Sequence, residues 1–199
     1  MPDVGQLSEA SNAPVERHLP GEAGIWIMIC GDMMVFSIMF AAFLFYRRAD
    51  LALFESSRVH LNQTLGLINT FLLLTSSWFV AMAVQAARAH RARAAVIMFR
   101  LALACGVGFS LLKIVEYTQK VRAGIVINSN DFYMYYYMFT GIHFLHVLIG
   151  MGVLAFMAHY VADGKFSEVK VGHIESGASF WHMVDLLWIA LFALLYLLR

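Results

Sequence analysis

Five long apolar runs constrain the fold of this 199-residue chain more than any other feature. A helix rises 1.5 Å per residue, so about 20 apolar residues cross the roughly 30 Å hydrocarbon core of a bilayer. None of the runs shows the alternation of polar and apolar residues that marks a barrel strand. The sequence therefore predicts an all-α integral membrane bundle of five transmembrane helices, at about Gly24–Tyr46, Leu65–Ala87, Ala94–Tyr117, Phe132–Val161 and Ala178–Leu198.

Composition supports a chain that is solvated mostly by lipid. Charged residues make up 14% of the sequence, whereas a soluble domain usually has about 25%. The net charge of +1 gives no basic footprint, so no nucleic-acid partner is expected. Residues 1–20 hold all three prolines and many small polar residues, which predicts a loose polar tail before a single domain at 21–199.

The charges between the spans predict an orientation. Arg88, Arg91, Arg93 and Arg100 gather around one short loop, and such loops are usually cytoplasmic. With five spans, this places the N-terminus inside and the C-terminus outside a multi-pass membrane protein. The pair Ser176-Gly177 is expected to introduce the fifth span.

Polar residues within the spans predict contacts between helices. Asn62, Asn69 and Ser76 recur every seven residues on one helical face, where interhelical hydrogen bonds and close packing are the expected use. Lys113 and Glu116 are three residues apart and therefore neighbours on a helix. They form either an internal ion pair or, through Glu116, part of a polar cluster shared with another helix.

Two further pairs have the same spacing, His143 with His146 and His182 with Asp185. Packing histidines explain them better than a metal or haem site, which would need more ligands at a compatible depth. Asp32 is the most isolated charge within a span. A lone intramembrane carboxylate is either a member of a proton relay or a group that pairs helices, and the sequence leaves both open.

Three segments resemble subunit III of the haem-copper oxidases, and the resemblance runs from Gly24 to Leu198. The most specific is Glu175-Ser-Gly-Ala-Ser-Phe-Trp-His-Met-Val-Asp-Leu-Leu-Trp188, followed by Thr140-Gly-Ile-His-Phe-Leu-His-Val-Leu-Ile-Gly150 and the pair Glu116-Tyr117. Many members of that family have seven spans, so this chain resembles the short five-span branch. The stretches Leu19–Trp26 and Asn69–Ser77 are most similar to members associated with nitric oxide reductases.

The resemblance implies an accessory subunit without its own cofactor, in a bacterial cytoplasmic (inner) membrane. Its partners would be membrane lipids and a catalytic haem-copper oxidase or nitric oxide reductase subunit, which holds haem with copper or iron. Asp32 stands where the family commonly has a glutamate, which makes it the candidate for proton uptake. The other candidates are expected to form a buried polar network that joins the last three helices: Glu116, His143, His146, Glu175, His182 and Asp185.

The hypothesis is a non-catalytic subunit III-like protein that supports complex stability and proton uptake in aerobic or nitric oxide electron transport. One alternative keeps the family but makes the chain an assembly or activation factor that the mature enzyme does not retain. Another is a proton-coupled transporter, although internal repeats and broken helices, typical of transporters, are not evident. A third is a di-haem electron carrier.

Overall fold

The structure, a computed structural model, describes residues 23–164 and 168–198, so the predicted tail at residues 1–20 lies outside the described residues. Within the described part the chain is helical and contains no strand. Five helices there are long and apolar enough to cross a membrane, which confirms the predicted all-α membrane bundle. The elements are α2 (Ala23–Ala49), α3 (Leu51–Arg58), α4 (Gln63–Arg88), α5 (Ala92–Arg122), α6 (Asp131–Val161), α7 (Glu168–Phe192) and the π-helical turn η1 (Ala193–Leu197).

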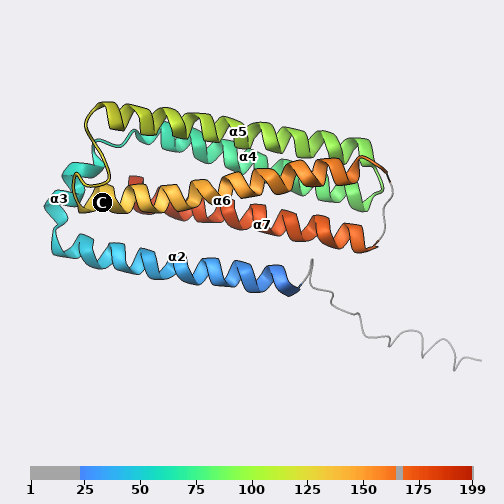
Figure 1. Cartoon of the computed structure of the whole chain (residues 1–199), viewed down its shortest axis with the longest axis horizontal. Helices are drawn as coiled ribbons and strands as arrows, with labels where there is room; N and C mark the ends of the chain where they lie inside the picture. Colours follow the sequence, from blue (N-terminus) through green and yellow to red (C-terminus); the bar gives the residue numbers. More distant parts are fainter. Residues whose placement is uncertain (1–22, 165–167, 199) are drawn as a thin grey trace, which may run out of the picture.

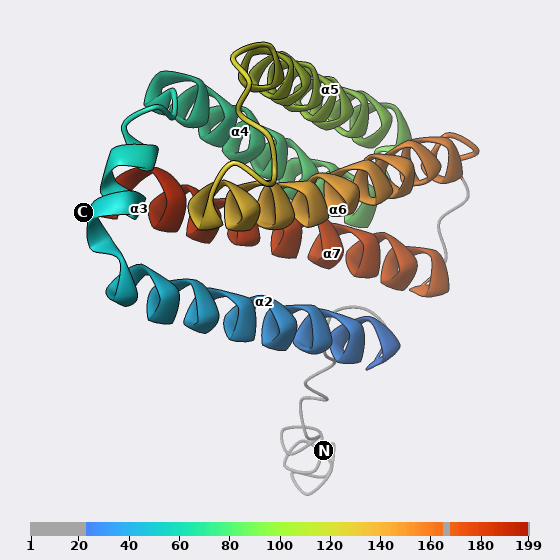
Figure 2. The same ribbon diagram turned by 60° about the vertical axis from the view of Figure 1, so that its left-hand side comes forward.

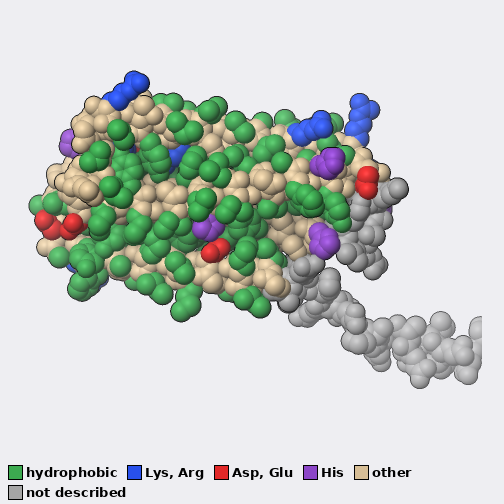
Figure 3. Space-filling view, in the orientation of Figure 1, with side chains coloured by type: hydrophobic (Ala, Val, Ile, Leu, Met, Phe, Trp, Pro, Cys, Tyr) green, Lys and Arg blue, Asp and Glu red, His purple; other side chains and the backbone are tan. Residues whose placement is uncertain are grey.

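Four of the long helices form a packed bundle, and the fifth lies along one side of it. Helices α4, α5, α6 and α7 run side by side with alternating direction, while α2 lies beyond α6 and α7 (Figures 1 and 2). The short helix α3 joins α2 to α4 at one end of the molecule (Figure 1). Side chains of Lys, Arg, Asp and Glu on the face shown in Figure 3 lie mainly near the two ends, and the middle is largely hydrophobic.

Local signals set the helix boundaries at the end where α3 lies. Asp50, Asn62 and Asn130 cap α3, α4 and α6, each accepting a hydrogen bond from the backbone N–H three residues later. Asn62 is therefore a cap and not part of the polar face within the span. The other two residues of that seven-residue pattern, Asn69 and Ser76, are fully buried, and Ser76 donates to the Ala102 carbonyl of α5 at 2.9 Å.

The expected start of the fifth span at Ser176-Gly177 is wrong, because α7 already begins at Glu168. Gly177 lies inside the helix for a packing reason. A Cβ at this position would lie 2.7 Å from the Met157 sulfur of α6, so only glycine fits without a shift. Glycines at helix contacts allow close approach in membrane proteins, and here that role looks in sequence like a helix boundary.

Close approach at glycines also explains how one deeply buried tryptophan packs in the bundle. Trp181 of α7 packs against Gly150 of α6 and Gly106 of α5, where added Cβ atoms would lie 2.6 Å and 3.2 Å from its ring. The side chain is 1% exposed. Gly150 and Trp181 thus pair across α6 and α7, and together with Gly106 they fix how closely three helices approach.

Helix α2 is held mainly by aromatic side chains. Phe43 contacts Phe54 of α3 and three rings of α6, Phe132, Tyr135 and Phe139, with centroid distances of 5.4–6.4 Å. Phe43 is buried, although most of α2 is exposed. Because these contacts lie in the half of α2 near α3, that half is the better anchored one.

Candidate functional site

The most buried charged groups form a cluster between α5, α6 and η1. Lys113 and Glu116 make the ion pair expected from their spacing, with Nζ and Oε2 2.9 Å apart and side chains 1% and 2% exposed. Lys113 also donates to the hydroxyls of Tyr136 (3.2 Å) and Tyr196 (3.4 Å). Both tyrosines in turn donate to Glu116 Oε1, at 2.8 Å and 2.7 Å. The three ammonium hydrogens of the lysine can each have a partner.

Aromatic rings complete the surroundings of the lysine. Its Nζ lies 5.0–5.9 Å from the ring centroids of Tyr117, Tyr136, Trp188 and Tyr196. Cation–π attraction adds to the hydrogen bonds at such distances. The sequence located the ion pair but not the tyrosines, because several tyrosines share the start of α6 and Tyr196 lies beyond the recognised segments.

Asp32 and His146 meet between α2 and α6. His146 Nε2 lies 3.5 Å from Asp32 Oδ2, and the two side chains are 16% and 28% exposed. The other ring nitrogen, Nδ1, is 2.9 Å from the Ile142 carbonyl, which can only accept. Nδ1 therefore carries a hydrogen, and an Nε2–Oδ2 hydrogen bond needs one further proton, on the histidine or on the aspartic acid. The geometry brings an imidazole and a carboxyl within ion-pair distance of each other between two helices.

A third set of polar contacts lies between α4 and α7. Arg88 donates to Glu175 Oε1 at 2.9 Å, and Ser77 hydrogen-bonds His182 Nδ1. A cavity of about 230 Å³ extends between these contacts. Asp185, one turn beyond His182, is 5% exposed, and its Oδ1 has no partner among the described residues.

His143 lies in the core without a hydrogen-bond partner in the described part of the chain. It is fully buried, with its ring centroid 5.3 Å from that of Trp188 and 5.9 Å from that of Phe109. Asn69, also fully buried, likewise has no partner among the described residues. Buried polar groups usually bind a protein group or an ordered water, so these two side chains are exceptions within the described bundle.

The six residues expected to form one network are therefore distributed over separate contacts. Among the described residues, none of these six side chains donates a hydrogen bond to another; they are Glu116, His143, His146, Glu175, His182 and Asp185. His182 and Asp185 share Ser77 as a hydrogen-bond partner, and the other hydrogen-bonded ones bind residues of their own. The structure brings together Asp32 and His146, which the sequence treated separately.

Within residues 23–164 and 168–198, no three His, Cys, Asp or Glu side chains lie close enough together to hold a metal ion. The long helices and the hydrogen bonds inside the bundle define a multi-pass helical membrane protein. Its most buried ion pair is bonded to tyrosines of two other elements, α6 and η1.

Comparison with known proteins identifies the family. The family model for cytochrome c oxidase subunit III matches residues 5–199, so the chain belongs to that family. It is 28% identical over 198 residues to quinol oxidase subunit 3 of Bacillus subtilis, with 94% of each chain covered. It is 27% identical to cytochrome c oxidase subunit 3 of a Synechocystis species, covering 97% of this chain and 87% of that one.

Proposed function

We propose that the chain is the accessory subunit III of a bacterial haem-copper respiratory complex and binds its catalytic subunit within the membrane. The family match over residues 5–199 carries this proposal. Haem, with copper or iron, would belong to the catalytic partner, and this chain would contribute stability and proton supply. Relatives named as quinol and cytochrome c oxidase subunits favour oxygen as the acceptor of the complex.

The first test is purification of the tagged full-length chain in mild detergent, followed by an absorbance spectrum and mass spectrometry of the proteins that accompany it. Haem bands and a large catalytic subunit at constant stoichiometry are expected. A colourless chain that purifies alone would contradict a permanent subunit and favour an assembly factor or a transporter. Oxygen and nitric oxide consumption by the same preparation then distinguish an oxidase from a nitric oxide reductase.

Within this proposal, the Asp32–His146 pair is the proton-supplying group. Asp32 lies nine residues after the start of α2, about 14 Å along the helix, and is partly exposed on the side of the bundle. A carboxylate at such depth is costly unless it is paired or protonated. A pair that holds one exchangeable proton at the surface of the bundle can pass it to a subunit packed against that surface.

Replacement of Asp32 tests this role. In the purified complex, Asp32→Asn is expected to slow proton uptake and turnover severalfold while subunit content and haem spectra stay unchanged. His146→Gln should give a similar defect, because it removes the other half of the pair. Asp131→Asn, which changes an exposed carboxylate in the first turn of α6, is the control and should behave like wild type. Wild-type proton uptake in Asp32→Asn would exclude this residue from proton supply.

The proposed topology places the arginine-rich end of the bundle in the cytoplasm, with the N-terminus inside and the C-terminus outside. Labelling of single cysteines introduced at His90 and at Gly124, which lie in loops at opposite ends, tests it with a membrane-impermeant reagent. In intact spheroplasts only the cysteine at position 124 should react. The reverse result would invert the topology.

A further inference from the structure

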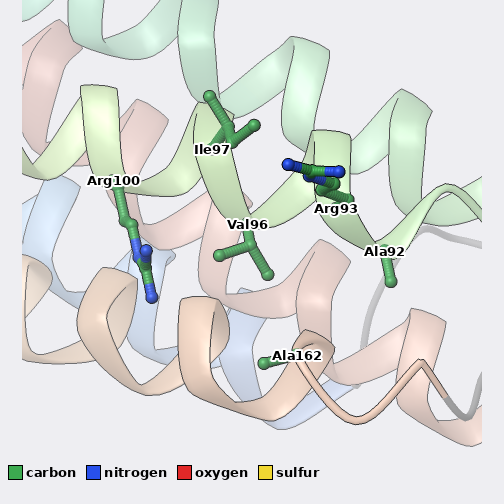
Figure 4. A pocket seen from close by; sticks show the side chains of 6 residues that line it. All are labelled: Ala92, Arg93, Val96, Ile97, Arg100 and Ala162. Atoms are coloured by element: carbon green, nitrogen blue, oxygen red, sulfur yellow. The ribbon is translucent and has the colours of Figure 1, made fainter.

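A groove on the outer surface of the bundle lies between α5 and α6, at the arginine-rich end. Its cavity has a volume of about 510 Å³. Among the residues that the structure describes, Arg93 and Arg100 of α5 supply its charged lining, and the other lining residues are Ala92, Val96, Ile97 and Ala162 (Figure 4). The Arg100 side chain extends from α5 towards α6, and Ala162 lies on the α6 side (Figure 4).

The two arginines share one face of α5 because they are seven residues, or two helical turns, apart. Both are exposed, and neither forms an ion pair with any residue that the structure describes. Arg88, at the same end of the bundle, pairs with Glu175. The groove therefore holds positive charge that this part of the protein does not neutralise.

The depth of Arg100 makes that charge significant. It lies eight residues after Ala92, about 12 Å along a helix that crosses the membrane. A long cationic side chain at this position extends its charged end towards the lipid headgroups, because a charge in hydrocarbon is costly. Asp163, just beyond the end of α6, takes part in an interaction of its own.

Phosphate is the anion that matches these features. A guanidinium binds a phosphate through two parallel hydrogen bonds, and two guanidinia on one face can bind one phosphate from both sides. Val96 and Ile97 lie between the arginines and present hydrocarbon, with Ile97 47% exposed. An apolar wall beside two cations fits a molecule that has an acyl chain and a negatively charged headgroup.

We propose that this groove binds the headgroup of an anionic phospholipid, with its phosphate between Arg93 and Arg100 and an acyl chain along Val96 and Ile97. Basic grooves between helices at the cytoplasmic side commonly bind such headgroups. The site is independent of the Asp32–His146 pair, which lies between α2 and α6.

Native mass spectrometry of the purified full-length chain with added phosphatidylglycerol or phosphatidylcholine tests the proposal. One phosphatidylglycerol should be retained preferentially by wild type. Arg93→Gln combined with Arg100→Gln should weaken its binding about thirtyfold, corresponding to roughly 1 kcal/mol for each arginine. Arg91→Gln is the matched control, because it removes a charge from the same end of the bundle, where Arg91 lines a different cavity between α4 and α5. It should change the affinity less than twofold on the same scale.

A second variant keeps the charges and removes the space. Val96→Phe fills the groove and should weaken phosphatidylglycerol binding while both arginines remain. This variant tests the groove even if the double arginine variant fails to fold. Equal retention of phosphatidylcholine, equal losses in Arg91→Gln and in the double variant, or no effect of either groove variant would overturn the proposal. Displacement of the lipid by millimolar inorganic phosphate would also overturn it, because the groove would then bind a free anion.

Discussion

Lys113 shows how a single residue can be charged and buried in this fold. An ion in the interior is tolerated only when its partner and its remaining hydrogen-bond capacity are both satisfied. Glu116 supplies the counter-charge, and the hydroxyls of Tyr136 and Tyr196 bind both ions. The arrangement joins α5, α6 and η1 at one point, so its loss affects three elements at once.

Lys113→Met should therefore lower the free energy of unfolding by about 3–5 kcal/mol, because Glu116 would remain buried without a counter-charge. Chemical unfolding in detergent, followed by tryptophan fluorescence, measures the change. Lys113→Met combined with Glu116→Gln should cost less than Lys113→Met alone. Arg122→Met, at an exposed position in the last turn of α5, is the control. A double variant that loses as much as the two single variants added together would contradict a coupled pair.

At the scale of helices, the approach of α6 to α7 depends on Gly150. Gly150→Ala would place a methyl group 2.6 Å from the Trp181 ring, so the helices must separate or the ring must move. We expect a loss of about 1–3 kcal/mol in the free energy of unfolding, the usual cost of overpacking. Gly152→Ala, in the same helix but with no atom within 4 Å of the new Cβ, should be neutral or stabilising. Equal losses in both variants would show that helix contact is not the cause.

The stability of helix α3 is expected to depend on pH through Glu55. Hydrogen bonds from Arg58 and Arg47 hold the pKa of this carboxyl below its ordinary value of 4.5. A lowered pKa in the folded state stabilises the fold above the ordinary value and loses that effect as the pH falls through the folded pKa. The protection factors of the amides of residues 51–58, which are exchange rates corrected for the intrinsic pH dependence, should therefore fall below about pH 4.5 and stay constant near neutrality. Glu55→Gln should abolish this dependence, and an unchanged dependence in that variant would assign it to another group.

The helices were largely predictable from sequence, whereas their contacts were not. Apolar length alone predicts α2, α4, α5 and α6 to within a few residues, since lipid imposes that length. Helix α3 was missed because eight mixed residues carry no such signal. The pairing of Asp32 with His146 depends on where α2 packs, which no local pattern encodes. Gly177 shows the opposite difficulty, because one residue type serves both helix ends and helix contacts.

The whole molecule is a four-helix bundle with a peripheral fifth span. Phe43→Ala would remove four ring contacts that hold α2 to α3 and α6. At roughly 0.5–1.5 kcal/mol for each contact, we expect a loss of about 2–6 kcal/mol in the association of α2 with the bundle. Crosslinking between cysteines introduced on α2 and α6 measures it. Phe45→Ala, an exposed ring on the same helix, should leave crosslinking unchanged. Reduced crosslinking in both variants would point to a general weakening of α2.

The position of Tyr196 has a consequence for how the chain is made. It follows Glu116 by 80 residues, so the lysine–glutamate pair enters the membrane well before one of its two tyrosine partners is synthesised. Until the last span is inserted, Glu116 lacks the hydrogen bond from Tyr196, and the nascent bundle contains an incompletely hydrogen-bonded ion pair. A chain that stopped before Tyr196 would lack this hydrogen bond to Glu116. The contact that stabilises the finished protein thus also distinguishes it from its unfinished forms.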